Sequence, residues 1–316
     1  MKPGRRLHWP LLLLWTLAAG VPVPSRADGG VGAVVAQLRV EDDADDLQGL
    51  LARGGLLFDY ASPYEYAGLA LQNLHYAQDG WSEDVVGLVG LYRKQRRATL
   101  EGLRAEGGLA VVGGTLRPIG DATWTLRPRA STGVELIAAA DVVGTREAIE
   151  RSITYGLAAA SVEQQFGARW TAIGLLGWQP FTDGNARALL RARLIYSLLP
   201  DQGVSAQLRW RQYSSRDEDV GGAYFNPERY RNWDAGLAWR HRVHGWRLSG
   251  LAGLGQERID DQSWQSTGVA ELRAEATLTG GSILDVGLTY SNSAGFATAP
   301  DYWYSALNVV VTFPLR

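Results

Sequence analysis

The sequence predicts an all-β protein: an antiparallel up-and-down β-barrel that spans a membrane with about fourteen strands. The first observation is that apolar side chains alternate with polar or small ones over segments of roughly ten residues. The second is that short and long connections alternate between these segments. The third is composition: 38 Gly, 12 Trp and 13 Tyr among 316 residues suit β-hairpins with aromatic girdles at two membrane interfaces.

The N-terminus has the pattern of a secretory signal peptide. Lys2, Arg5 and Arg6 precede an apolar run over 7–17, which is shorter than the ~20 residues that a spanning helix needs. Small residues follow, and Ala27 offers a cleavage point. We therefore expect residues 1–27 to be removed on export; an uncleaved anchor is the alternative.

Residues 28–63 differ in character from the rest of the chain. They contain an acidic run over 41–46, followed by a leucine-rich stretch. We expect this segment to be a solvated periplasmic tail. Its alternative place is inside the barrel, against basic side chains of the lumen. The barrel itself is expected over 64–316.

The clearest strand is 202–213, where the period is two residues. One face carries Val204, Ala206, Leu208 and Trp210, and the other carries Ser205, Gln207, Arg209 and Arg211. The same reasoning predicts strands near 66–76, 84–93, 97–112, 119–127, 132–141, 152–162, 169–178, 186–198, 202–213, 229–242, 245–257, 264–278, 282–292 and 301–315. Twelve or sixteen strands also fit, because 97–127 has room for an extra hairpin.

Strand length and connection rhythm distinguish a membrane barrel from a soluble sandwich. The expected strands exceed the usual soluble length of about 5–6 residues. Short turns are expected near 94–96, 128–130, 199–201, 243–244 and 279–281. Longer loops are expected near 77–83, 142–151, 179–185, 213–229, 258–263 and 292–300. Short periplasmic turns and long outer loops produce this rhythm.

The last strand alternates up to the C-terminus, through Trp303, Leu307, Val309, Val311 and Phe313. It resembles the terminal strand that the barrel-assembly machinery reads, although three residues follow Phe313 where a terminal Phe is commonest. We therefore expect the outer membrane of a Gram-negative bacterium, with the lipid bilayer and the assembly machinery as partners.

The strand register assigns a set of charged side chains to the lumen. The candidates are Arg187, Arg191, Arg193, Arg209, Arg211, Asp234, Arg240, Arg247, Glu271, Arg273, Glu275 and Asp285. One interpretation is a set of Arg–carboxylate cross-links that brace the wall. The other is a polar conduit that contacts a hydrated solute. Fourteen strands lie between a filled interior and an open channel, and an inward-folded loop could plug it.

Catalysis and cofactor binding have little support. The chain has no cysteine, and it shows no metal constellation, phosphate loop or nucleotide fingerprint. We expect no cofactor, no metal and no catalytic residues. A net charge of -2 gives no overall electrostatic attraction for nucleic acid, so nucleic acid is not expected as a partner. The alternative is a lipid-modifying barrel hydrolase, in which His75 pairs with a serine such as Ser82.

Two short elements carry a family resemblance. Phe181-Thr182-Asp183-Gly184-Asn185-Ala186-Arg187 resembles an F-x-D-G-N-x-R element, and Tyr224-Phe225-Asn226-Pro227-Glu228-Arg229-Tyr230 resembles a Y-F-x-P-x-x-Y element. Both are similar to elements in the C-terminal barrels of bacterial exopolysaccharide exporters (cellulose and poly-N-acetylglucosamine types) and in YaiO-type barrels. The similarity covers roughly 64–316.

The resemblance implies a passive outer-membrane pore for a polysaccharide. Those exporters carry a tetratricopeptide scaffold before the barrel, so a periplasmic partner would have to supply one here. The motif aromatics are Phe181, Tyr224, Phe225 and Tyr230. Both motifs also have a local interpretation, as a tight turn and as girdle aromatics. A plugged structural or adhesive barrel remains a further alternative.

Overall fold

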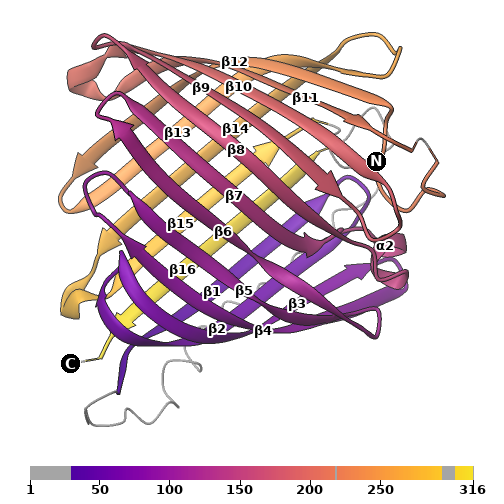
Figure 1. Ribbon diagram of the computed structural model, residues 1–316, viewed down its shortest axis with the longest axis horizontal. Coiled ribbons are helices and arrows are strands. Elements are labelled where there is room, and N and C mark those ends of the chain that lie inside the picture. Colours follow the sequence, from indigo (N-terminus) through magenta and orange to yellow (C-terminus); the bar gives the residue numbers. More distant parts are fainter. Residues whose placement is uncertain (1–29, 218, 294–302, 316) are drawn as a thin grey trace, which may run out of the picture.

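The computed structural model describes residues 30–217, 219–293 and 303–315 (Figure 1). Its strands form one closed antiparallel barrel in which each strand pairs with its neighbours in sequence, and β16 pairs with β1. Closure satisfies the backbone hydrogen bonds of every strand without a free edge, as a bilayer requires. The all-β barrel prediction is therefore confirmed.

Within the described residues, the barrel has sixteen strands. They are β1 (Val31–Asp43), β2 (Gln48–Ser62), β3 (Glu65–Gln78), β4 (Trp81–Gln95), β5 (Gly102–Val112), β6 (Thr115–Arg129), β7 (Thr132–Val142), β8 (Thr154–Phe166), β9 (Trp170–Pro180), β10 (Ala186–Leu199), β11 (Val204–Ser215), β12 (Arg229–Val243), β13 (Trp246–Ile259), β14 (Gln265–Thr277), β15 (Ile283–Ser291) and β16 (Tyr304–Pro314).

The strand count corrects the expectation of fourteen. Each expected strand is present, as β3 to β16, and the two additional strands lie in the segment expected to be a periplasmic tail. That assignment of 28–63 is wrong, because β1 and β2 occupy 31–43 and 48–62. The acidic run was misleading because it spans the end of β1 and a tight turn. The expected signal peptide lies outside the described residues.

The seam between the first and last strands closes the barrel. β1 and β16 pair continuously from Ala33 opposite Pro314 to Asp43 opposite Tyr304. The strand expected to carry the assembly signal is therefore fully paired, between β15 and β1.

The outward face of the wall is apolar. Large side chains that point away from the lumen are strongly exposed, among them Leu254 at 77%, Leu176 at 66% and Leu71 at 64%. Exposed apolar surface of this extent is costly in water. A lipid environment removes that cost, as in other transmembrane barrels.

The two ends of the barrel differ in their connections. We call the end where β1 meets β2 the loop end, and the opposite end the turn end. The loop end carries the long connections over 143–153, 181–185 and 216–228, and also tight turns such as Gly113-Gly114, where both φ angles are positive. The expected alternation of short and long connections therefore holds for the later strands only.

One short helix, α2 (Arg146–Glu150), lies in the β7–β8 connection at the loop end (Figure 1). Thr145 caps it, since the backbone N–H of Ala148 donates to the Thr145 hydroxyl at 3.3 Å. Among the described residues, no helix is long and apolar enough to cross a membrane.

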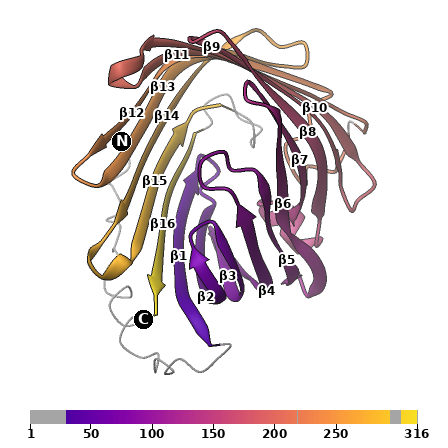
Figure 2. The same ribbon diagram turned by 60° about the vertical axis from the view of Figure 1, so that its left-hand side comes forward.

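The inner face is not uniformly polar. An apolar inner cluster fills the concave side of β2–β6, with members Leu47, Leu51, Ala70, Leu74, Tyr76, Val85, Val89, Ala110, Val112, Ile119, Val142 and Ile149. Figure 2 shows β1 to β5 along one side of the ring of strands and β9 to β13 along the other. Strands β4 and β5 approach closely at Gly108, where an added Cβ would lie 1.9 Å from the Leu88 carbonyl oxygen.

Candidate conduit and its closure at the loop end

The structure places all twelve expected lumen side chains on the inward face. The register makes this explicit at mid-barrel. Outward Leu208 lies opposite Leu194 and Ala235, whereas the next residue, Arg209, lies opposite Arg193 and Asp234. The same alternation carries through β13, β14 and β15. The two-residue periodicity of the sequence was thus sufficient to assign these side chains to the inward face of the wall.

Seven of these side chains form ion pairs that join different strands of the wall. Arg209 bonds Asp234 at 2.6 Å and Glu271 at 3.1 Å. Arg247 pairs with Glu275 at 2.8 Å, and Arg273 Nε donates to Asp285 at 2.9 Å. Arg209 and Asp234 are only 11% and 8% exposed. Because a charge of this kind is costly to leave without its partner, these pairs brace β11 to β15.

Other inward arginines have no carboxylate in contact. Within the described ranges, Arg191, Arg211 and Arg240 make no ion pair, and Arg193 donates to the amide oxygen of Gln207 at 2.8 Å. Arg191 lies directly opposite Arg211 across the β10–β11 pair. The expected Arg–carboxylate lumen is therefore only partly a cross-linked network.

A second polar cluster escaped the sequence prediction. Arg53 on β2 bonds Glu106 on β5 at 2.8 Å and the side-chain oxygen of Gln72 at 3.0 Å. Arg104 lies 3.5 Å from Asp121. The alternation of β5 and β6 contains this signal, but Arg53 fell in the segment expected to be a tail.

At the loop end, the two motifs that carry the family resemblance are joined. We call this contact the loop clasp; it comprises Phe181, Asp183, Asn185, Arg187, Tyr224, Phe225 and Asn226. The rings of Phe181 and Tyr224 stack at 4.8 Å with an interplanar angle of 11°. The Arg187 guanidinium lies 4.8 Å from the Phe181 ring centroid and donates to the Phe225 carbonyl.

Hydrogen bonds complete the loop clasp. Asn185 Nδ2 donates to the Tyr224 hydroxyl at 3.1 Å and to Asn226 Oδ1 at 2.9 Å. The Tyr224 hydroxyl in turn donates to Asp183 Oδ2 at 2.8 Å. Burial raises the pKa of Tyr224 above its ordinary value, so the phenol keeps the proton that it donates. The Asp-Gly-Asn turn is thereby fixed to the β11–β12 loop.

The girdle interpretation of the motif aromatics is wrong. Phe181, Tyr224, Phe225 and Tyr230 are all buried, because they point into the loop end and not toward lipid. Tyr230 stacks on Tyr213 at 4.8 Å and donates to Glu257 at 2.9 Å. These rings are covered by one another.

The β7–β8 connection also joins this assembly. The Thr145 hydroxyl donates to the Ala223 carbonyl at 2.5 Å, and Ala148 packs with Ile153 and the loop-clasp aromatics. Ile149 is fully buried in the apolar inner cluster. Three connections from separate hairpins therefore form one packed layer at the loop end.

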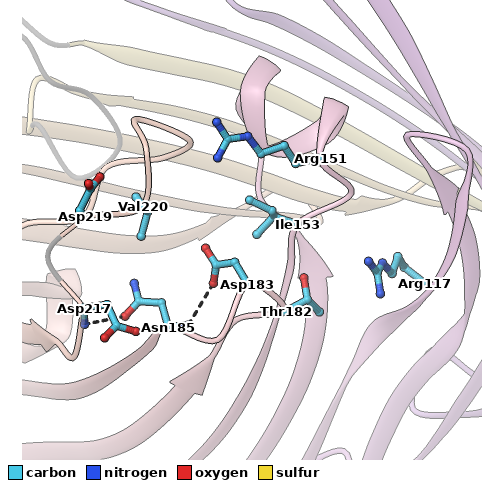
Figure 3. Close-up of a pocket in the computed structure, with 9 residues that line it drawn as sticks. All are labelled: Arg117, Arg151, Ile153, Thr182, Asp183, Asn185, Asp217, Asp219 and Val220. Atoms are coloured by element: carbon cyan, nitrogen blue, oxygen red, sulfur yellow. Dashed lines mark hydrogen bonds between the residues drawn. The ribbon is translucent and has the colours of Figure 1, made fainter.

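A polar pocket of about 380 Å³ lies beside the loop clasp. Figure 3 shows its lining from four parts of the chain, namely β6, the α2 connection and the next two long loops. The lining residues are Arg117, Arg151, Ile153, Thr182, Asp183, Asn185, Asp217, Asp219 and Val220. Charges of both signs line it, which suits a polar ligand more than an apolar one.

The expected hydrolase residues lie on the outer wall. His75 Nδ1 is 3.0 Å from Asp84 Oδ1, and Asn73 donates to the same oxygen at 3.0 Å. Both partners of the His75 pair are exposed on the lipid-facing side. In the parts of the chain described, His75 and Ser82 share no hydrogen bond, and no group of acidic, His or Cys side chains is placed to hold a metal.

Comparison with known proteins defines the class through the fold. No family model matches the chain, and no curated protein matches it in sequence. A solved structure described as a bacterial polysaccharide outer membrane secretin has a TM-score of 0.62 at 11% identity, over 91% of this chain and 100% of that chain. OccK7 (OpdD) from Pseudomonas aeruginosa gives a TM-score of 0.45 at 12% identity, over 92% of this chain and 99% of that chain.

The chain is an outer-membrane β-barrel whose fold is similar to that of the outer-membrane secretin. The closed sheet, its apolar outer surface and the similarity to the secretin agree on this class.

Proposed function

We propose that this barrel is an outer-membrane conduit for export of a bacterial exopolysaccharide. The observation that carries the proposal is an inward wall rich in charged and polar side chains, built by β10 to β15, inside a closed sixteen-strand barrel. A ring of this size lies at the lower edge of the range that encloses an aqueous channel. The two resembled motifs and the fold similarity to a polysaccharide secretin support the same function.

The cross-section favours a thin, linear solute. The apolar inner cluster occupies one side of the interior, and the packed layer of loops lies at one end. The remaining polar wall suits a single hydrated chain better than a broad general diffusion path. A sugar polymer offers hydroxyl groups that exchange hydrogen bonds with Arg, Gln and Asp side chains along this wall.

Export also requires partners at the turn end. We propose that the barrel-assembly machinery inserts the chain and that a separate periplasmic scaffold delivers the polymer. Transport then runs from the turn end to the loop end, if the longer connections face outward as in other barrels.

Vesicle release tests this proposal. Protein is reconstituted into vesicles loaded with fluorescent linear oligosaccharide or with branched dextran of equal mass. A variant with 217–226 replaced by a short Gly-Ser linker removes the loop clasp; the matched control shortens 261–263. We expect the clasp variant to release the linear sugar faster than dextran. Retention of both sugars by the clasp variant would contradict a conduit.

A second candidate function rests on the His75–Asp84 hydrogen bond. It leaves the Nε2 atom of His75 free on the lipid-facing wall, where a general base for acyl hydrolysis would sit. Phospholipase activity that disappears in both His75→Ala and Ser82→Ala would support this function. Equal activity in the wild type and both variants would exclude it.

A further inference from the structure

We infer that the lumen carries a binding path for polyanionic glycan, in which guanidinium groups on β10 to β12 hold carboxylates on the sugar rings. This basic ladder comprises Arg191, Arg193, Arg211, Arg240 and Arg242; it excludes Arg209, which already holds two carboxylates, and Arg187, which is held in the loop clasp. The inference names the substrate class of the proposed exporter and rests on that function for transport, but the binding step is tested separately.

The central rung of the basic ladder places like charges face to face. Arg191 lies opposite Arg211, and Arg193 lies opposite Arg209, in successive inward pairs of the β10–β11 ladder. Like charges directly opposite one another destabilise a sheet. An anion held between them would remove the repulsion, and this arrangement is therefore what an anion site requires.

Protein carboxylates neutralise the Arg193–Arg209 pair but not the Arg191–Arg211 pair. Arg209 takes up both Asp234 and Glu271, and Arg193 is bound to Gln207. Among the residues that the structure describes, neither Arg191 nor Arg211 has an acidic partner. Arg191 is exposed although it faces inward, so its guanidinium is open to the lumen.

The basic ladder runs from Arg191 on β10 toward the turn end of the barrel. Arg240 and Arg242 lie near the turn end of β12, where both are exposed and, in the described part of the chain, unpaired. Inward positions two residues apart on one strand are roughly 7 Å apart. A bound chain can thus pass its charged groups from one guanidinium to the next.

The opposite wall of the barrel lacks an excess of positively charged side chains. There several inward arginines pair with carboxylates, as in Arg53 with Glu106 at 2.8 Å, Arg39 with Glu41 at 3.2 Å and Arg127 with Glu163 at 3.6 Å, whereas Arg93 and Arg117 hydrogen-bond to neutral groups. Positive charge is therefore concentrated on one side of the polar wall. Guanidinium binds carboxylate through two parallel hydrogen bonds, so the ladder favours uronate-type sugars over neutral ones.

Binding to detergent-solubilised full-length protein tests the inference. The ligands are a galacturonic acid oligomer, a cello-oligosaccharide of equal length and free galacturonate. The test variant is Arg191→Gln/Arg211→Gln. The control, Arg97→Gln/Arg129→Gln, removes the same charge from exposed positions at the turn end. Both variants must keep the heat-modifiable gel mobility of the wild type.

We expect the galacturonic acid oligomer to bind the wild type and the control equally. Its affinity for the Arg191/Arg211 variant should fall about tenfold or more, because charge-assisted hydrogen bonds are lost. The oligomer should also raise the melting temperature of the wild type but not of this variant. The cello-oligosaccharide should bind at least ten times more weakly, on the same grounds.

Equal binding of both oligomers, or unchanged affinity in the Arg191/Arg211 variant, would overturn the inference. Tight binding of free galacturonate with no gain for the oligomer would also overturn it, since a small-anion site would then suffice. Vesicle release separates the two proposals. Anionic oligomer that binds but is never released contradicts export alone, whereas release of neutral chains without anionic binding contradicts the basic ladder alone.

Discussion

Arg187 shows how much of the loop end depends on one side chain. Its guanidinium lies 4.8 Å from the Phe181 ring, 4.9 Å from the Tyr213 ring and 5.3 Å from the Tyr224 ring. It also donates to the Phe225 carbonyl. The two-residue periodicity predicted that Arg187 faces inward, but no local pattern could reveal that two of its partners, Tyr224 and Phe225, come from a loop about forty residues further along.

The change Arg187→Gln should loosen the loop clasp without unfolding the barrel. The glutamine loses the cation–π contacts and leaves a buried carbonyl without its donor, at a cost of about 1–3 kcal/mol. We expect limited proteolysis within 216–228 to become faster, while the heat-modifiable mobility is retained. Arg129→Gln, an exposed position on β6, is the control. Cleavage of both variants at the wild-type rate would rule out this role.

Individual strands show where sequence reasoning succeeded and where it failed. The strands from β3 onward follow from alternation, because each has one lipid face and one lumen face. β1 and β2 were missed for a physical reason: the charges of Glu41 and Asp43 lie on the inward face of β1, next to further acids in the turn. In the sequence, these inward acids and the acids of the turn form one acidic run. The ion pair of Arg53 was missed with them.

The close approach of β4 to β5 predicts a contrast between two adjacent glycines. At Gly108 an added Cβ would lie 1.9 Å from the Leu88 carbonyl oxygen, whereas at Gly107 the nearest atom is 4.0 Å away. We expect Gly108→Ala to destabilise the barrel by about 1–3 kcal/mol through strain, and Gly107→Ala to have little effect. Urea unfolding in detergent micelles measures both. Equal effects would mean that β4 does not approach Gly108 as closely as described.

The seam between β1 and β16 is the element on which closure depends. The chain has no cysteine, so an introduced pair reports cleanly. Leu38 lies opposite Val309, at a separation that a disulfide can bridge. We expect the oxidised double variant Leu38→Cys/Val309→Cys to resist hot detergent until a reductant is added. The offset pair Leu38→Cys/Leu307→Cys should cross-link poorly. If this offset pair cross-linked better than Leu38→Cys/Val309→Cys, the register between β1 and β16 would differ from the one described.

At the scale of the molecule, the sequence could predict the class of fold but not the shape of the lumen. Alternation specifies faces, and it predicted a wall that is apolar outside and polar inside. It could not reveal the apolar inner cluster, since that depends on how closely β2 to β6 curve around Ile149. The packed layer at the loop end likewise joins three hairpins that are distant in sequence.

The central claim is that one closed barrel encloses a polar passage that the loop clasp restricts. Ion conductance across a planar bilayer measures this directly, with the wild type compared with the protein in which a Gly-Ser linker replaces 217–226. We predict discrete, steady steps that are larger in the clasp variant. A bilayer that stays silent with both proteins, while both keep their heat-modifiable mobility, would contradict the account.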